Sequence, residues 1–471
     1  MAPVSATSTS AGGALLDRLA GIVGAAHVLT EPDVTAGYTR DWTGRFRGAT
    51  PAVVRPADTE QTAAVVAACA AAGAPLVPQG GNTGLVGGGV PLAGELVLSL
   101  RRLTRLDPVD RLASQVTAGA GVTIAALQAH ASAAGLAYGV DLGARDSATL
   151  GGTIATNAGG LQLLRYGGTR EQLVGCEAVL ADGSIVRHLD GLLKDNTGYD
   201  LGKLLCGSEG TLGVVTAARV RLHPAYAERV AALLAFASVE AAVAAVMGVK
   251  HRLESLEAAE LFFGDGLALV CDALGLPAPF PQRHPAYVLL QCAAHHDPTD
   301  ELAAALGELD GLVDAAVAAD TARRRELWRY REGHTEAINS LGAPHKLDVT
   351  IPAARIAEFV AAAPAVVAAA APAARTWLFG HAADGNVHVN VTGVAPEDDT
   401  VDDVVLRCAA SFGGSISAEH GIGTAKKPWL HLNRSPAELA AFGAIKRALD
   451  PAGVLNPNVL LPAAGTGSEA P

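Results

Sequence analysis

Two histidines and one glutamate, in two short segments of this chain, could hold a divalent metal ion. His381 and His388 lie in GHAADGNVHVN, residues 380–390, and Glu419 lies in SAEHGIG, residues 417–423. Two imidazoles and one carboxylate, with a coordination position left open, are the usual ligands of a catalytic metal. His420 directly follows Glu419 and would serve as an acid–base group, because histidine titrates near neutral pH. The pattern therefore predicts His381, His388 and Glu419 as metal ligands, His420 as the catalytic residue, and zinc or manganese as the ion.

A turn between the two histidines is necessary for this metal site. Residues seven apart on one straight strand face opposite sides, because side chains alternate along a strand. Asp384-Gly385 is a dipeptide typical of tight turns, and it would let His381 and His388 converge. Asn390, two residues after His388, would then face the same pocket. The alternative is two unrelated surface histidines on a hairpin, which the nearby Ser-Ala-Glu-His-Gly segment makes less favoured.

Length and charge restrict the class of protein. The chain has 471 residues, which suits two or three domains. Its formal charge is 35 − 47 = −12, so nucleic acid is not an expected partner. The six cysteines form no C-x-x-C pair. They indicate buried apolar positions in a reducing compartment rather than a disulfide framework or a zinc ribbon.

No targeting or membrane segment is expected. Residues 1–13 have no apolar core and no arginine, so they resemble neither a secretory signal nor a transit peptide. The most apolar windows contain Glu240, or Pro364 and Pro372, which we expect to interrupt a membrane span. We therefore expect a cytoplasmic protein with no membrane span.

Periodicity and turn signals change at about residue 223. Before it, the pattern predicts strands at 53–54, 76–78, 96–98, 114–118 and 211–222, a helix at 59–71 capped by Thr59, and an Asp-Gly hairpin at 179–186. After it, alanine-rich helices at 238–250, 299–307 and 353–370 alternate with strands such as 287–291, and a helix at 439–449 ends at Asp450-Pro451. This predicts an α+β chain with domains at 14–222 and 223–450 and a C-terminal segment, 451–462, that returns to the first domain. Residues 1–13 and 463–471 are expected to be loose tails.

Three glycine clusters in the first half could surround a pyrophosphate. They span residues 80–89, GGNTGLVGGG, 151–160, GGTIATNAGG, and 207–213, GSEGTLG. Glycine permits positive φ and lets backbone N–H groups approach an anion closely. Neither a G-x-G-x-x-G motif in a strand–helix context nor a Walker A motif is present, so the common dinucleotide and P-loop folds are excluded. One such cluster could be a simple turn, but three in one β-rich region favour a ligand.

These clusters, together with KDNTGYD at 194–200, resemble the FAD-binding motifs of the vanillyl-alcohol-oxidase/p-cresol-methylhydroxylase fold. The second half resembles the branch that contains D-2-hydroxyglutarate dehydrogenase, D-lactate dehydrogenase and the glycolate oxidase flavoprotein subunit. The resemblance runs from about Tyr38 to Leu461. It implies a two-part FAD-binding domain, followed by an α+β substrate (cap) domain with a C-terminal helical segment.

The resemblance implies which residues bind FAD. Relatives with a covalent flavin have histidine after the first double glycine, where this chain has Asn82, so noncovalent FAD is expected. Many relatives have cysteine before the second glycine pair, where this chain has Ala148-Thr149-Leu150. The implied FAD-binding residues are Gly80, Gly81, Asn82, Thr83, Gly84, Leu85, Gly151, Gly152, Thr156, Asn157, Gly159, Glu209, Gly210, Gly213, Val215 and Asn456.

A further cluster could bind a substrate carboxylate. Arg331 and Thr335 are four apart, on one face of a helix, and Lys346 lies downstream. Alone, such an arginine-rich run would more often be a solvated helix face. The resemblance favours substrate binding by Arg331, Thr335, Lys346 and Asn390.

The resemblance implies an FAD- and metal-dependent oxidation of a D-2-hydroxy acid to the 2-oxo acid, with D-2-hydroxyglutarate as the expected substrate. An electron-transfer flavoprotein, a quinone or another acceptor would reoxidise the flavin, and a homodimer is one expectation. The alternatives are a D-lactate dehydrogenase, a glycolate oxidase subunit, a metal-dependent hydrolase that uses His420, and a flavin-binding scaffold subunit of a larger complex.

Overall fold

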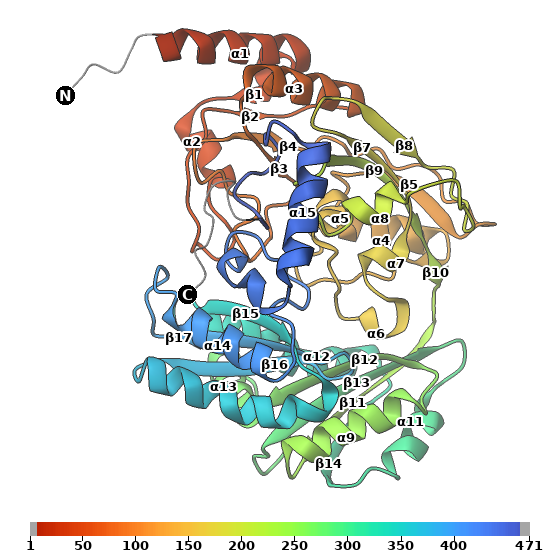
Figure 1. Cartoon of the computed structure of the whole chain (residues 1–471). Coiled ribbons are helices and arrows are strands. Elements are labelled where there is room, and N and C mark those ends of the chain that lie inside the picture. The colour runs from red at the N-terminus through yellow and green to blue at the C-terminus, as the bar shows by residue number, and fades with distance from the viewer. Residues whose placement is uncertain (1–6, 462–471) are drawn as a thin grey trace. The chain divides into compact units, whose positions relative to one another are not determined.

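The computed structural model describes residues 7–461 (Figure 1). By its internal contacts the chain divides into two compact units. Within the described residues, the first unit contains residues 7–159, Gly168–Pro224 and residues 420–461. The second unit contains Gly160–Gly167 and Ala225–Glu419. This division differs from the predicted boundaries mainly after residue 419, where the chain rejoins the first unit about thirty residues earlier than predicted.

Two four-stranded sheets form the framework of the first unit. One has the order β1-β2-β4-β3, in which β2, β4 and β3 are parallel, and the other is antiparallel with the order β5-β9-β7-β8. A small β10-β6 pair is separate. The strands are β1 Val28–Leu29, β2 Val53–Val54, β3 Leu76–Gln79, β4 Leu96–Ser99, β5 Gln115–Gly119, β6 Leu136–Ala137, β7 Leu173–Val179, β8 Ile185–His188, β9 Val214–Arg221 and β10 His223–Pro224.

Helices cover these sheets and enclose two apolar cores. The helices are α1 Thr7–Val23, α2 Pro32–Thr35, α3 Thr59–Ala72, α4 Ile124–Ala133, α5 Leu150–Thr156, α7 Thr169–Gln172, α8 Leu201–Leu205 and α15 Pro436–Leu449, with 3-10 turns at Ala25–His27, Ala36–Tyr38 and Lys427–Leu432. Leu19 and Val23 of α1 pack with Val65 and Val66 of α3 over the first sheet. Ile124 and Leu127 of α4 belong to the core of the second sheet.

Two local predictions in the first unit were wrong. Residues 7–13, expected in a loose tail, begin helix α1, because the helix gains burial of Leu19 and Val23 farther along. The N-cap of α3 is Asp58, whose side chain accepts the N–H of Gln61, rather than Thr59. Thr59 is buried and donates instead to Glu177. The predicted tail at 463–471 lies outside the described residues.

One seven-stranded antiparallel sheet, of order β14-β11-β13-β12-β16-β17-β15, forms the centre of the second unit. Its strands are β11 Glu228–Phe236, β12 Leu256–Phe263, β13 Ala286–Ala294, β14 Leu312–Ala318, β15 His345–Thr350, β16 Arg375–His381 and β17 Asn386–Thr392. The helices are α6 Leu163–Tyr166, α9 Val239–Lys250, α10 Gly264–Leu274, α11 Thr299–Leu306, α12 Thr321–Asn339, α13 Ile356–Ala370 and α14 Thr400–Ser411, with a 3-10 turn at Ala353–Arg355.

The helices of this unit form two groups. Leu267 of α10 and Tyr330 and Ile338 of α12 pack on one face of the sheet, in a core that contains Phe262 and Phe379. Helices α9, α13 and α14 pack against one another and against the sheet, and Figure 1 shows them in front of it. Because α12 crosses the face that carries Phe379, its buried side chains reach the strands that bear the predicted metal ligands.

The helix predicted at 353–370 is confirmed as α13, although it contains Pro364. This residue lies inside the helix, where a proline costs about 3 kcal/mol. The buried side chains Ile356, Phe359, Ala363 and Val367 recur on one helical face and offset that cost. By length and composition, Ala353–Ala370 would suffice to cross a membrane, but a core helix of a soluble protein meets the same criterion, so this stretch is weak support for a span.

None of the six cysteines forms a disulfide, as predicted. Four of them are buried, whereas Cys271 and Cys408 are only half-buried.

Candidate active site

The two predicted histidine ligands face each other across a hairpin. Strands β16 and β17 pair antiparallel, with His381 opposite Asn386, so His388 lies on the same face two residues farther on. The Nε2 atoms of His381 and His388 are 3.4 Å apart. Gly385 in the connecting turn has φ +81°, and a Cβ there would lie 2.3 Å from the Ile351 carbonyl oxygen. The predicted Asp-Gly turn is therefore confirmed, and it requires glycine.

Glu419 completes a triangle with the two histidines. Its Oε1 lies 3.8 Å from His381 Nε2 and 3.7 Å from His388 Nε2. Ligand atoms that bind one zinc ion at about 2.0–2.2 Å lie roughly 3.3–3.8 Å from one another. The three predicted ligands thus fit a single divalent ion. His420, the next residue, is the first residue of the last segment of the first unit.

A buried carboxylate lies behind each histidine. Glu260 Oε1 is 2.7 Å from His381 Nδ1, and Asp348 Oδ1 is 3.4 Å from His388 Nδ1. Such partners fix the tautomer and ring orientation of a ligand histidine, and leave its Nε2 to face the metal. Asp348, His388 and Glu419 also offer ligand atoms within 4.8 Å of one another, so Asp348 could itself reach an ion.

Backbone contacts orient Glu419. Asp348 Oδ2 accepts the N–H groups of Ala418 at 3.1 Å and Glu419 at 2.8 Å. The N–H of Gly160 donates to Glu419 Oε2 at 3.2 Å. The Gly160 contact therefore fixes Oε2 of Glu419, and Oε1 is the carboxylate oxygen that faces the two histidines.

Burial and neighbouring charges shift the pKa values of Glu260, His381 and His388 in different directions. Burial alone would raise the pKa of Glu260, but the nearby charges of His381 and Arg331 outweigh burial and hold this pKa below its usual range. Burial opposes a charge on His381, but Glu260 and Glu419 outweigh it and raise the His381 pKa well above its usual value. Burial lowers the pKa of His388. A bound ion would replace the proton on His381, because a ligand imidazole must be neutral at the coordinating nitrogen.

Lys346 and Asn390 lie on the face of the sheet that carries the histidines. In the β15–β17 register Lys346 is opposite Asn390, and Asp348 is opposite His388. Lys346 Nζ donates to Asn390 Oδ1 at 3.4 Å, and burial lowers the Lys346 pKa to about 8. Within residues 7–461, Asn390 Nδ2 is buried without a hydrogen-bond partner. An acceptor from a bound molecule would satisfy it.

Arg331 already contacts other residues of the protein, so it is less available to bind a substrate than the sequence indicates. It is buried on α12, its Nη2 lies 2.7 Å from Glu260 Oε2, and its guanidinium is 4.6 Å from the ring centre of Phe379. Its Nε is buried and has no hydrogen-bond partner among the described residues. Thr335, one turn farther along α12, is half-buried. Glu260 was missed by sequence reasoning, although two glutamates in the otherwise apolar strand LEAAELFF were a usable signal.

The first glycine loop presents a row of backbone donors. The N–H groups of Gly81 to Leu85 donate to no acceptor in the part of the chain that the structure describes. Asn82 has φ +56°, and its Nδ2 donates to the Arg40 carbonyl at 2.8 Å. Arg101 donates to the carbonyls of Gly80 and Gly81, at 3.1 and 2.8 Å, and so fixes the opposite edge of the loop. Successive free N–H groups in such a turn suit an anion.

The polar side chains predicted to bind FAD mostly hold the loops together. Asn157, at φ +51°, ends α5 and accepts the N–H of Arg170 at 3.0 Å. Asn456 donates to the Gly88 carbonyl at 3.0 Å and to the Glu209 carbonyl at 2.8 Å. Thr156 donates to Gly152 within its own helix.

Glu209, another residue predicted to bind FAD, also holds a loop in place. Its carboxylate accepts the N–H groups of Ile422 at 2.8 Å and Gly423 at 2.7 Å, so it fixes the segment that follows His420. The predicted FAD-binding residues all lie in the first unit, and the predicted metal ligands and substrate-binding residues all lie in the second.

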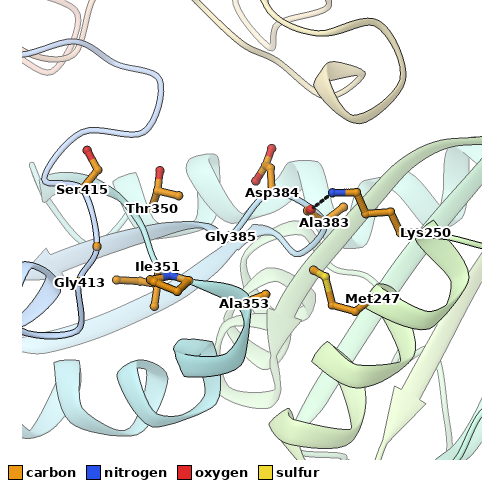
Figure 2. A pocket seen from close by; sticks show the side chains of 12 residues that line it. Met247, Lys250, Thr350, Ile351, Ala353, Ala383, Asp384, Gly385, Gly413 and Ser415 are labelled. Atoms are coloured by element: carbon orange, nitrogen blue, oxygen red, sulfur yellow. Dashed lines mark hydrogen bonds between the residues drawn. The ribbon is translucent and has the colours of Figure 1, made fainter.

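A hollow of about 450 Å³ lies beside the turn between β16 and β17 (Figure 2). In Figure 2 the side chains of Thr350, Asp384 and Ser415 point to one side, and Lys250 Nζ donates to the Ala383 carbonyl at 2.8 Å. Burial raises the pKa of Asp384. The residues that line this hollow include none of the predicted substrate-binding residues, so we do not assign the substrate to it.

Comparison with known proteins identifies the family. Residues 50–188 match the model of an FAD binding domain, and residues 226–460 match the C-terminal domain of FAD linked oxidases. The chain is 38% identical to a D-2-hydroxyglutarate dehydrogenase of Xanthomonas citri pv. viticola over 93% of this chain and 95% of that protein. The chain belongs to the family of FAD-linked oxidases that contains the D-2-hydroxyglutarate dehydrogenases. It is therefore an FAD-dependent oxidoreductase, and the hydrolase alternative is set aside.

Other members of this FAD-linked oxidase family are similarly close. The chain is 34% identical to a D-2-hydroxyglutarate dehydrogenase of Stutzerimonas stutzeri, over 96% of this chain and 99% of that protein. It is 36% identical to the bovine mitochondrial D-2-hydroxyglutarate dehydrogenase, over 92% of this chain and 81% of that protein. The cytoplasmic location expected from the sequence stays a prediction.

Solved structures establish the fold of this FAD-linked oxidase. A p-cresol methylhydroxylase structure matches with a TM-score of 0.76 at 16% identity, over 95% of this chain and 96% of that chain. The 4-ethylphenol oxidase of Gulosibacter chungangensis matches with a TM-score of 0.74 at 18% identity, over 96% of this chain and 97% of that chain. The predicted α+β class and vanillyl-alcohol-oxidase-type FAD-binding fold are confirmed.

Proposed function

We propose that this FAD-linked oxidase oxidises D-2-hydroxyglutarate to 2-oxoglutarate with noncovalent FAD and one divalent metal ion. The observation that carries the proposal is the triangle of His381, His388 and Glu419, with ligand atoms 3.4–3.8 Å apart, on a sheet face that also bears Lys346. A metal ligand set beside a buried cation suits a substrate with a hydroxyl group and more than one carboxylate. Two histidines and one carboxylate favour zinc or manganese.

Each predicted residue has one task in this reaction. Bound FAD would accept the hydride from the substrate, and a bound ion would lower the pKa of the α-hydroxyl group. His381, His388 and Glu419 hold the ion, and His420 accepts the hydroxyl proton. Arg331, Thr335, Lys346 and Asn390 bind the carboxylates, which orients the substrate. The sixteen residues predicted above hold FAD, with the free N–H groups of Gly81 to Leu85 around the pyrophosphate.

We assign the distal carboxylate of the diacid to Lys346. Arg331 pairs with Glu260, and Lys346 Nζ lies 3.4 Å from Asn390 Oδ1 on the sheet face that carries the two histidines. A diacid supplies a second carboxylate for this ammonium group, and D-lactate and glycolate do not. Lys346 is therefore expected to decide between the diacid and the monoacids, which remain the alternative substrates.

The substitution Lys346→Met tests this assignment. We expect kcat/KM for D-2-hydroxyglutarate to fall about ten- to a hundredfold, because a lost charged hydrogen bond costs about 1.5–3 kcal/mol. The value for D-lactate should change little. Steady-state rates with an artificial electron acceptor measure both, and Arg325→Met, at an exposed cation of the same unit, is the control. Equal losses for the diacid and the monoacid would contradict a distal-carboxylate role.

Acid precipitation tests the noncovalent attachment of FAD. Asn82 offers no nucleophile for a flavin bond, and its side chain is occupied by the carbonyls of Gly37 and Arg40. We therefore expect all of the yellow chromophore in the supernatant after acid treatment. Absorbance spectra of supernatant and redissolved pellet give the result, and colour that stays with the pellet would contradict it.

The reduced flavin requires an electron acceptor. We propose a protein or quinone acceptor, such as an electron-transfer flavoprotein, because the family members named above are dehydrogenases. A homodimer stays a prediction. The complete set of His381, His388, Glu419 and His420 favours an active enzyme over a flavin-binding scaffold subunit.

A further inference from the structure

Glu260 contacts both a predicted metal ligand and a predicted substrate-binding residue. Its Oε1 lies 2.7 Å from His381 Nδ1, and its Oε2 lies 2.7 Å from Arg331 Nη2. In the β12–β16 register Glu260 is directly opposite His381, so the two side chains share one face of the sheet. Arg331 approaches that face from α12. One carboxylate therefore joins residues from three different elements.

The burial of Glu260 requires these two partners. Its side chain is only 1% exposed, and a buried carboxylate is costly unless it is paired and hydrogen-bonded. Arg331, also buried, supplies a full positive charge, and His381 supplies an N–H. If Glu260 lost its contact with Arg331, the buried guanidinium would be left without this partner. If it lost its contact with His381, the imidazole ring would no longer be held in its orientation.

Glu257, on the same strand, provides a natural comparison. It is equally buried, and it pairs with Arg229 at 3.4 Å and accepts from Gln291 at 2.8 Å. The contacts described for Glu257 include neither His381 nor His388. The strand thus holds two buried glutamates that each pair with an arginine, and only Glu260 reaches the metal ligands.

We propose that Glu260 is a positioning residue that couples metal binding to substrate binding. Through Oε1 it keeps His381 Nδ1 protonated and turns Nε2 toward the ion. Through Oε2 it holds the Arg331 guanidinium so that the buried Nε is left for the substrate. This inference rests on the proposed metal-dependent function. It extends that function because one residue, Glu260, would orient both the metal ligand His381 and the substrate-binding residue Arg331.

The substitution Glu260→Gln tests both halves of the proposal. A glutamine keeps the size of the side chain but loses the charge, and its NH2 group would face a guanidinium that also only donates. We expect the dissociation constant for Zn²⁺, measured by competition with a chromogenic chelator, to rise about 10–100-fold, the usual effect of losing such a partner. At saturating Zn²⁺, kcat should recover, but KM for D-2-hydroxyglutarate should stay raised about tenfold or more.

Glu257→Gln is the matched control and should leave both the Zn²⁺ affinity and KM unchanged. Wild-type Zn²⁺ affinity in folded Glu260→Gln would overturn the inference while the proposed function stands. Absence of Zn²⁺ binding in the wild-type enzyme would instead contradict the proposed function. If circular dichroism shows that Glu260→Gln does not fold, the Zn²⁺ affinity and KM of Glu260→Asp are measured instead. It keeps the charge but is too short to reach both partners, so unchanged affinity there also overturns the inference.

Discussion

His388→Ala is expected to abolish turnover while the protein keeps its FAD. His388 Nε2 lies within 3.4 Å of His381 Nε2 and 3.7 Å of Glu419 Oε1, so its loss removes one corner of the ligand triangle. A metal that polarises the substrate supplies several kcal/mol, so we expect flavin reduction to slow by on the order of 10³-fold or more. FAD content should not change, because the predicted FAD-binding residues belong to the first unit.

Two measurements check this expectation. The ratio of flavin to protein absorbance gives the FAD content, and stopped-flow mixing with D-2-hydroxyglutarate gives the rate of flavin reduction. His251→Ala, at an exposed histidine of the same unit, is the control. Chelation of wild-type enzyme should have the same effect as His388→Ala, and Zn²⁺ or Mn²⁺ should restore the rate. Full activity in thoroughly demetallated enzyme would rule out the metal role.

His420→Asn is expected to bind substrate but to reduce flavin about 10²–10⁴-fold more slowly, the usual range for a lost general base. Asparagine keeps a hydrogen-bonding side chain of similar size but cannot accept the hydroxyl proton. The neighbouring backbone should not move, because Glu209 holds the N–H groups of Ile422 and Gly423.

Stopped-flow flavin reduction over a range of substrate concentrations separates binding from the chemical step. The limiting rate should fall, and the concentration for half saturation should stay close to that of the wild-type enzyme. A limiting rate equal to that of the wild-type enzyme would exclude His420 as the base.

Local sequence patterns were enough to propose the candidate metal ligands, but not to identify the residues that contact them. The Asp-Gly turn and the period of a strand place His381 and His388 on one face, and both signals are local. Glu260 lies 121 residues before His381 in the chain, and only the β12–β16 pairing brings them together. The pairing of strands that are far apart in the chain cannot be predicted from a local sequence pattern. The pairing of Arg331 with Glu260 could not be predicted for the same reason.

Fold predictions failed where tertiary packing outweighs local preference. Residues 7–13 were predicted to be a loose tail, but they begin α1, which buries Leu19 and Val23 farther along. Thr59 and Asp58 are both suitable N-caps, and the choice depends on Glu177, a distant residue that binds the threonine. By contrast, strands near glycine turns and the end of α15 at Asp450 were correct, because turn and cap residues act locally.

Anaerobic reduction of the bound flavin by D-2-hydroxyglutarate tests the central claim most directly. The purified enzyme is mixed with the substrate without any electron acceptor, and the oxidised-flavin absorbance and the 2-oxo acid are measured together. We predict that D-2-hydroxyglutarate bleaches the flavin and yields one 2-oxoglutarate per flavin, faster than D-lactate or glycolate does and with no reaction of the L-enantiomer. Flavin that stays oxidised with D-2-hydroxyglutarate, but is bleached by D-lactate or glycolate, would contradict the proposed substrate. Flavin that no 2-hydroxy acid reduces would contradict the proposed reaction.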